Sequence, residues 1–390
     1  MILRTDFHRK EIINFTQKLI QIPSVEGLET KVCQLIEKKL AKYGFKGQYF
    51  GEDKERLNFI VRLKGENSSR ILLFNGHTDV VSSGDESKWQ YAPFSAKLVN
   101  NKIYGRGAAD MKGGLVSLVL TAILLKESKI KLNGDIVFAF TANEENAQSE
   151  GTGVQYLLKK NLLKANVCIV AEPKTNYINI GSRGVYRFSI KTIGRSWHTG
   201  RIRDVGTNAV LKMAKVLLAL DKYKLKYRVH RYFPPPKISA GTVICGGTTI
   251  NVVPDECESL VDIRLSFGQT KQSVKRDLNL LFQKLKKKDK KLKIKIKEML
   301  YVPPAIINEN HEIVSLLQKY AKEILCFSPQ LKVTGPAGDS NFLINKGIPA
   351  VMFGPNGENF HSENEFVEIE SIFQVAEIFT QTAIEYLKRR

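Results

Sequence analysis

The sequence has little that would place the protein in or across a membrane. In its 390 residues we find no charge-poor apolar run of about 18 or more residues, the length that a membrane-spanning helix requires. The first stretch, Met1–Ile20, mixes charged with apolar residues, so it lacks the uninterrupted apolar core of a signal peptide and is predicted to form an amphipathic helix. We therefore expect a soluble, cytoplasmic protein with no membrane partner.

Cysteine is also scarce. The five cysteines are odd in number and scattered, without the close pairing that marks a zinc knuckle or a redox motif: Cys33, Cys168, Cys245, Cys257 and Cys326. Such cysteines are expected to be buried thiols in a reducing compartment. Gly, Pro and Ser form no tract long enough to indicate a disordered region, so the whole chain is expected to fold.

Positive charge, in contrast, is abundant. The formal net charge is +21, and a basic surface attracts the phosphates of nucleic acids. Nearly half of this charge lies between Lys271 and Lys297, where 12 Lys or Arg and 2 Asp give +10. Within that segment, lysines alternate with Leu292, Ile294 and Ile296, which is the period of a strand with one wet and one buried face. The pattern favours a solvated lysine face, and we do not expect a nucleic-acid partner.

The length and the pattern of apolar residues indicate two domains, since a single core stops growing near ~250 to 300 residues. In residues 1–180, short apolar runs such as Ile71–Phe74 and Ile136–Phe140 alternate with helical patterns, as in an α/β sheet. Apolar runs of this kind return in residues 301–390. We predict an α/β domain made of residues 1–180 and 301–390, with residues 181–300 inserted as a second, α+β domain.

Polar side chains that suit metal ions follow the predicted strands. His77 and Asp79 come two residues apart after the strand Ile71–Phe74, where the imidazole can bind a metal and the carboxylate can fix the ring. Asp110 lies between glycines at a predicted loop-to-helix junction, and its two oxygens could each bind one of two cations ~3.5 to 4 Å apart. Taken alone, each motif also has a simpler explanation, as a polar pair in a loop or as a helix cap.

Three further sites complete the pattern. The strand Ile136–Phe140 runs into Glu144 and Glu145, one of which can ligate a metal while the other stays free as a base. Glu172 ends another apolar strand, and His361 follows the last one. Because open α/β sheets bind ligands at the ends of their strands, these side chains are expected to converge. Two His and three carboxylates, one of them shared, supply three ligands for each of two metals and leave a position open for water, as in catalytic zinc sites.

The order of these motifs resembles the acetylornithine deacetylase / succinyl-diaminopimelate desuccinylase family of metal-dependent deacylases and exopeptidases. The agreement extends over nearly the whole chain and rests on the stretches Gly76–Val81, Gly105–Gly113, Asn143–Glu145, Ala171–Pro173 and His361 with Asn364 and Glu365. The resemblance implies a zinc-exopeptidase-like catalytic domain with a mixed central sheet flanked by helices. It also implies that the inserted domain is a lid through which two chains form a homodimer.

The resemblance assigns the metal ligands. It implies that His77, Asp110 and Glu172 hold one Zn²⁺, with Co²⁺ or Mn²⁺ as substitutes. It implies that Asp110, Glu145 and His361 hold the other, so that Asp110 bridges the two ions.

The resemblance also assigns roles to residues that do not bind metal. Glu144 would be the general base, and Asp79 would orient His77. In the lid, His198 would reach the active site of the partner subunit and polarise the scissile carbonyl. Three further lid residues match positions near the substrate's carboxylates in the family: Arg183, Asn251 and Arg264.

These roles imply zinc-dependent hydrolysis of the amide bond of a small N-acyl amino acid, N-succinyl-diaminopimelate or N-acetylornithine, as in amino-acid biosynthesis. A metal-bridged hydroxide would attack the carbonyl, with Glu144 as the base. The alternative within the family is an exopeptidase that acts on dipeptides or carboxy-terminal residues, and a remote one is a metal-free binding protein with a basic lid. The Gly-Thr-Ser-Asp-Gly stretch of the desuccinylases is replaced here by Gly335–Asn341, whereas Trp89–Phe94 is most similar to the desuccinylases, so the acyl group stays open.

Overall fold

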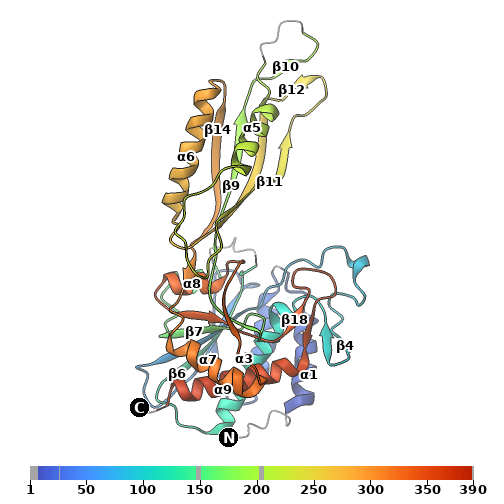
Figure 1. Ribbon diagram of the computed structural model, residues 1–390. Helices are drawn as coiled ribbons and strands as arrows, with labels where there is room; N and C mark the ends of the chain where they lie inside the picture. Colours follow the sequence, from blue (N-terminus) through green and yellow to red (C-terminus); the bar gives the residue numbers. More distant parts are fainter. Residues whose placement is uncertain (1–7, 26, 146–150, 202–205, 389–390) are drawn as a thin grey trace. The chain divides into compact units, whose positions relative to one another are not determined.

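The computed structural model describes residues 8–25, 27–145, 151–201 and 206–388. The chain divides into two compact units (Figure 1). The large unit comprises Met1–Gly181, Ile306–Lys332 and Gly338–Arg390, and the small unit comprises Ser182–Ala305 and Val333–Ala337. The small unit is thus inserted in the sequence of the large one.

A mixed nine-stranded sheet forms the centre of the large unit, in the order β1-β2-β6-β3-β7-β17-β8-β15, with β16 paired to β8. Its strands are β1 (Gly47–Phe50), β2 (Asn58–Leu63), β3 (Ile71–His77), β6 (Asp135–Thr141), β7 (Val167–Val170), β8 (Tyr177–Ser182), β15 (Ala305–Ile306), β16 (Gln330–Thr334) and β17 (Ala350–Met352). β3 runs parallel to β6 and β7, and β17 runs parallel to β7, whereas β2 is antiparallel to β6. The predicted mixed central sheet is confirmed.

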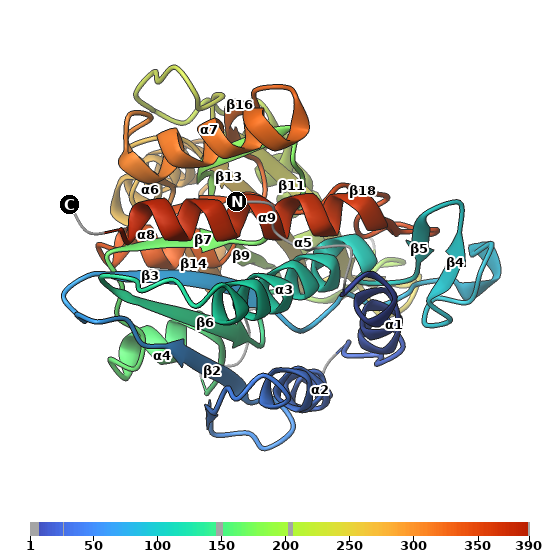
Figure 2. The same cartoon turned by 90° about the horizontal axis from the view of Figure 1, so that it is seen from below.

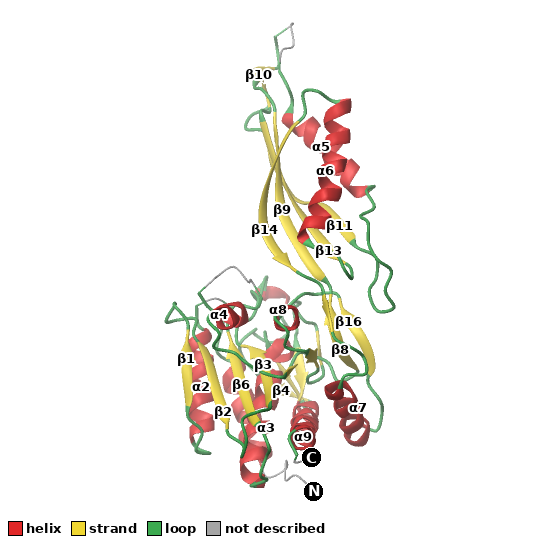
Figure 3. Cartoon of the chain, turned by 90° about the vertical axis from the view of Figure 1, so that its left-hand side faces the viewer, coloured by secondary structure: helices red, strands yellow, loops and turns green. Residues whose placement is uncertain are grey.

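Helices cover both faces of this sheet (Figure 2, Figure 3). The helices of the large unit are α1 (Arg9–Ile20), α2 (Glu29–Ala41), α3 (Gly113–Ser128), α4 (Gly153–Lys159), α7 (Glu312–Leu325), α8 (Asp339–Asn345) and α9 (Ile369–Tyr386). Leu73 of β3 belongs to an apolar cluster with side chains of α4 and α8. The ring of its neighbour Phe74 lies instead 5.3 Å from that of Phe379 in α9. Because both faces are buried, the central strands are mostly apolar, with polar residues such as His77 and Asp135 at their ends.

Helix α3 is apolar on all sides because it is buried on all sides. Among the residues that the structure describes, the helical stretch Ala108–Ser128 is long and apolar enough to cross a membrane, so the expectation that no such run exists was wrong. Its most apolar segment of 18 residues is 94% buried inside the protein. The core helix of a soluble protein can be as long and as apolar as a membrane-spanning helix. Its first turn lies against the sheet: a Cβ at Gly114 would stand 2.1 Å from the main-chain oxygen of Ala171, so glycine is required there.

A second sheet of the large unit has four short strands, in the order β18-β19-β5-β4. The strands are β4 (Lys97–Val99), β5 (Lys102–Tyr104), β18 (Gly357–Glu358) and β19 (Phe366–Glu368), and two short helical segments, η2 (Glu86–Lys88) and η3 (Ala108–Lys112), lie near them in sequence. β19 pairs antiparallel with β5, with Phe366 opposite Tyr104. The residue after β5 and the residue before β19 are therefore neighbours.

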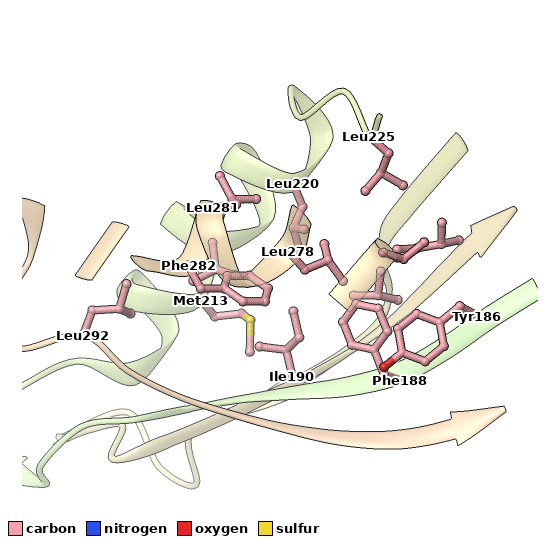
Figure 4. Close-up of a cluster of buried hydrophobic side chains, with 14 of the residues drawn as sticks. Tyr186, Phe188, Ile190, Met213, Leu220, Leu225, Leu278, Leu281, Phe282 and Leu292 are labelled. Carbon is pink, nitrogen blue, oxygen red and sulfur yellow. The ribbon is translucent and has the colours of Figure 1, made fainter. Parts of the chain in front are cut away.

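The small unit is an antiparallel sheet in the order β11-β13-β9-β14, packed against two helices. Its elements are β9 (Gly184–Ile193), β11 (Lys237–Gly246), β13 (Glu256–Leu265), β14 (Lys293–Val302), α5 (Ala209–Asp221) and α6 (Lys271–Lys288), with a short ribbon of β10 (Trp197–His198) and β12 (Val252–Val253). Figure 4 shows its core, where Phe188 and Ile190 of β9 face Met213 of α5 and Phe282 of α6. The predicted α+β insert is confirmed.

The lysine-rich segment ends in β14, an edge strand of this sheet. Lys293, Lys295 and Lys297 are exposed, as predicted, and Ile294 packs against the core of the small unit. Ile296 departs from the predicted alternation because 41% of it is exposed. Lysines on an edge strand discourage pairing with strands of other molecules.

Candidate metal centre

Five side chains of the large unit converge at strand ends and on two loops. His77 is the last residue of β3, Glu145 follows β6, and Glu172 follows β7. These three strands are neighbours and run parallel, so their carboxyl ends lie at one edge of the sheet. Asp110 comes from η3, and His361 from the loop between β18 and β19.

Two groups of three ligands could each hold a metal ion, and they share Asp110. In the first, His77 Nε2 lies 3.1 Å from Asp110 Oδ1 and 3.4 Å from Glu172 Oε1. In the second, His361 Nε2 lies 3.1 Å from Glu145 Oε1 and 3.4 Å from Asp110 Oδ2. Ligands ~2.0 to 2.2 Å from a tetrahedral zinc stand about 3.3 to 3.6 Å apart, so these separations suit such an ion. The two oxygens of Asp110 face different groups, as a bridging carboxylate requires.

The two ligand groups concentrate half-buried carboxylates. Burial, together with the charge of Asp110, raises the pKa of Glu172 to about 7. Burial also raises the pKa of Glu145, and it raises that of Glu144 well above the usual range. Hydrogen bonds to Asp110 and Glu145 raise the pKa of His361 to about 10. Bound cations would relieve the repulsion among these carboxylates, and a donor set of imidazole and carboxylate without thiolate fits a catalytic zinc or a similar ion.

Asp79 contacts the site in a way that the motif alone did not indicate. His77 Nδ1 lies 2.9 Å from the main-chain oxygen of Asp79, whereas the carboxylate of Asp79 lies 3.7 Å from it. The carboxylate instead accepts two hydrogen bonds, one from the main-chain N–H of Glu144 at 3.3 Å and one from that of Glu145 at 2.9 Å. Asp79 therefore touches both the first histidine and the turn that carries the two glutamates.

Glu144 is half-buried and belongs to neither group of metal ligands. Its pKa is influenced by the charges of His77, Glu145 and Glu172, which are ligands of the two groups. Its Oε1 lies over Gly338, where an added Cβ would stand 2.4 Å from it. The carboxylate is thus beside the ligands without being used by them, which is the placement expected of a base.

Asp339 is a buried carboxylate that the sequence analysis did not single out. It begins α8, and its Oδ2 accepts a hydrogen bond from Thr141 Oγ1 at 3.2 Å, at the end of β6. Burial raises its pKa to about 7. The sequence signal was its place in the stretch Gly335–Asn341, which was considered only for its departure from the desuccinylases.

The chain matches known proteins over most of its length. A sequence profile described as Peptidase family M20/M25/M40 matches residues 73–385. The chain belongs to this family. An M20 protein with two adjoining groups of metal ligands is a metallohydrolase, and the groups around Asp110 are its candidate metal centre. The family predicted from the motifs is confirmed, and the small unit corresponds to the M20 lid.

Individual M20 relatives differ in their activities. The chain is 29% identical over 388 residues to a protein named succinyl-diaminopimelate desuccinylase from Pelagibacter ubique (strain HTCC1062), with 96% of this chain and 98% of that protein covered. Its fold is similar to that of the M20 metallo-carboxypeptidase Sso-CP2 from Sulfolobus solfataricus, with a TM-score of 0.78, 21% identity and coverage of 96% and 98%. It is also similar to the YXEP protein of Bacillus subtilis, described as a dinuclear metal-binding peptidase, with a TM-score of 0.76, 18% identity and coverage of 98% and 99%.

The predicted lid residues form two pairs within the small unit of this M20 protein. His198 is exposed in β10, and the next residue, Thr199, donates its main-chain N–H to the oxygen of Asn251 at 3.0 Å. Arg183 Nη2 donates to the main-chain oxygen of Arg264 at 2.9 Å. The two pairs lie near opposite ends of β9, whose 10 residues span roughly 33 Å. The small unit alone therefore does not bring all four together, and their substrate contacts stay predictions.

Proposed function

We propose that the protein is a dinuclear, zinc-dependent deacylase that hydrolyses the amide bond of an N-acyl amino acid, such as N-succinyl-diaminopimelate or N-acetylornithine. The observation that carries this proposal is the pair of three-ligand groups that share Asp110, with the carboxylate of Glu144 free beside them. The full-length similarity to a protein named desuccinylase supports an acyl amino acid as the substrate.

The chemistry follows from the residues of the site. Two divalent ions bound there would lower the pKa of a water molecule and polarise the carbonyl of the amide. The carboxylate of Glu144 accepts a proton from the attacking water and then donates it to the leaving amine. The hydrogen bond from the main-chain N–H of Glu144 to Asp79 keeps its backbone beside the ligands.

An exopeptidase is the second candidate, and two observations favour it. The stretch Gly335–Asn341 departs from the desuccinylase motif. Solved structures with a similar fold include a carboxypeptidase and a dinuclear metal-binding peptidase. Both reactions cleave an amide by the same proton transfers, so the two candidates differ in the group that occupies the acyl side.

A substrate panel separates the two candidates. The zinc-loaded, full-length protein would be assayed for amine release from N-succinyl-diaminopimelate, N-acetylornithine and simple dipeptides, with chelator-treated protein as the control. We expect kcat/KM for one of the N-acyl amino acids to exceed that for every dipeptide by at least ~10-fold, the discrimination that a few pocket contacts provide. A preference for dipeptides would identify an exopeptidase. Absence of all hydrolysis with two zinc ions bound would contradict an amide hydrolase.

We also propose that the lid unit forms a homodimer with a second copy. Large apolar side chains are exposed on α5 and on the edge strand β11: Leu211, Leu218, Val243 and Ile244, each more than half exposed. The free edge of β11 can pair with another strand, and the apolar side chains can bury one another.

Sedimentation velocity tests this interface. We expect wild-type protein to be a dimer and Leu218→Lys to raise the dissociation constant by at least ~10-fold, because a charge would enter the apolar contact. Leu162→Lys, at an exposed position after α4 in the large unit, is the matched control and should leave the dimer intact. A monomeric wild-type protein at micromolar concentration would rule the interface out.

We further propose a cytoplasmic location. All five cysteines are free thiols, as is usual in a reducing compartment, although Cys245 and Cys326 are exposed rather than buried as expected. Recovery of the protein from the membrane or the periplasmic fraction of its cells would contradict this location.

A further inference from the structure

The loop that carries Asp110 is joined to the loop that carries His361. The two loops leave the paired strands β5 and β19. Gly105, the residue after β5, donates its main-chain N–H to the main-chain oxygen of Glu365 at 2.8 Å. The pairing therefore continues beyond both strands and brings Glu365 beside residues 105–110.

The carboxylate of Glu365 accepts four hydrogen bonds from that loop. Its Oε2 accepts one from Arg106 Nη1 at 2.7 Å and one from the N–H of Gly107 at 2.9 Å. Its Oε1 accepts one from the N–H of Ala109 at 2.9 Å and one from that of Asp110 at 3.0 Å. Glu365 is 1% exposed and Arg106 is 2% exposed, so water cannot easily replace either partner.

The main chain of this loop depends on an acceptor from outside. Gly107 has a left-handed φ of 78°, and Asp110, with φ −117° and ψ 95°, lies outside the helical region. N–H groups at the start of a helix have no partner within the helix. Glu365 supplies the acceptor for three N–H groups of this loop, which is otherwise held by main-chain hydrogen bonds such as that from Arg106 to Pro93. The course of the loop at Asp110, and with it the direction of the Asp110 carboxylate, therefore depends in large part on this side chain.

Arg106 is itself fixed from two further sides. Its Nε donates to the main-chain oxygen of Ser82 at 3.2 Å. Its guanidinium lies 5.1 Å from the centre of the Trp89 ring, within the range of a cation–π contact. The charge that faces Glu365 is therefore held in place by parts of the chain that carry no metal ligand.

We propose that the buried pair of Glu365 and Arg106 positions Asp110 for metal binding, and that the affinity of both metal sites depends on it. Neither residue belongs to the metal-ligand groups, so both act through Asp110. Because Asp110 is the shared ligand, a shift of its main chain weakens both sites. The inference rests on the proposed metal binding around Asp110 and is independent of the substrate.

The zinc affinity of full-length Glu365→Gln tests the proposal, measured by competition with a chromophoric chelator. Gln has the size of Glu, but its side-chain NH₂ group is a donor. It would face two N–H groups whose hydrogen bonds the carboxylate oxygen accepted. We expect both zinc dissociation constants to rise ~10- to 100-fold, as for other partners that orient metal ligands, and the visible spectrum of the Co²⁺-loaded protein to change. The control is Glu370→Gln, which removes an exposed ion pair with Arg9 and should retain wild-type affinity.

A second variant keeps the test decisive. Arg106→Gln leaves the three main-chain hydrogen bonds of Glu365 in place, so its loss of zinc affinity should be smaller than that of Glu365→Gln. Wild-type affinity at both sites in a folded Glu365→Gln protein overturns the proposal. So does failure of both variants to fold without zinc, which thermal melting of the metal-free proteins detects, because the pair would then support the domain rather than position a ligand. A wild-type protein that binds no zinc would instead reject the proposed function.

Discussion

Replacement of Glu144 by Gln is expected to lower kcat by ~10²- to 10⁴-fold, the usual contribution of a general acid–base group, while both metal ions stay bound. Gln has nearly the same shape as Glu, but its amide cannot take up a proton. Glu144 belongs to neither three-ligand group, so the metal ligands are left intact. Turnover of the best substrate of the panel, together with elemental analysis of the purified protein, measures both quantities.

The same substitution at an exposed position provides the control for Glu144. Glu52 has a side chain that is 64% exposed, so Glu52→Gln is expected to retain the wild-type kcat. If Glu144→Gln hydrolyses the substrate within ~3-fold of the wild-type rate, Glu144 is not the base, because general acid–base catalysis contributes far more than that. Loss of metal together with activity would assign Glu144 to the ligands.

Replacement of Asp110 by Asn is expected to abolish activity, with kcat at least ~10³-fold lower, and to remove both metal ions rather than one. The side-chain nitrogen of Asn carries no free electron pair for a cation, and the negative charge between the two sites is lost. A loss of ~10³-fold corresponds to about 4 kcal/mol of transition-state stabilisation. Isothermal titration calorimetry of the metal-free protein with zinc measures the number of metal sites and their affinities.

Comparison with single-site variants decides whether Asp110 is shared. His77→Ala and Glu172→Ala remove ligands of the first group and should leave the second ion in place, as judged by zinc content. Asp221→Asn, at the exposed end of α5, controls for the substitution itself. Two zinc ions bound to Asp110→Asn with wild-type affinity would show that Asp110 bridges nothing.

The ligand groups could be predicted from the sequence because each ligand stands next to a strong local signal. Three of the ligands, His77, Glu145 and Glu172, stand at or after the ends of buried apolar strands that run parallel. A parallel sheet brings these strand ends together irrespective of the conformation of the loops. Asp110 is flanked by glycines, which mark a place where the main chain approaches a ligand. The sequence analysis predicted the five residues from these signals and from the family resemblance.

The surroundings of the ligands could not be predicted in the same way. The hydrogen bonds of Glu365 to the Asp110 loop join residues about 255 positions apart. They depend on the register between β5 and β19, and neither of these short strands has a sequence pattern that predicts this register. Asp339 likewise meets Thr141 only after α8 has packed on the sheet. Interactions of this kind follow from tertiary packing and leave no periodic pattern.

The composition of α3 does not show what surrounds the helix. Helix α3 lies between the sheet and other helices, so it has no polar face. A helix of this type has the same composition whether protein or lipid surrounds it. Burial inside the protein, which covers 94% of its most apolar segment, distinguishes the two cases, and the first turn of the helix packs against Ala171.

Because the small unit is inserted in the sequence of the large one, the strands of the central sheet are synthesised at widely separated times. β17 lies between β7 and β8 in the central sheet, yet it begins only at Ala350. A ribosome that adds ~5 to 20 residues per second has translated β7 roughly ten seconds or more before it reaches this strand, because the whole small unit is made in between. β7 lacks its neighbour on this side until β17 pairs with it, and a product truncated before Ala350 would keep that edge open. Because an open strand edge can pair with other chains, β17 is expected to protect the completed protein from aggregation.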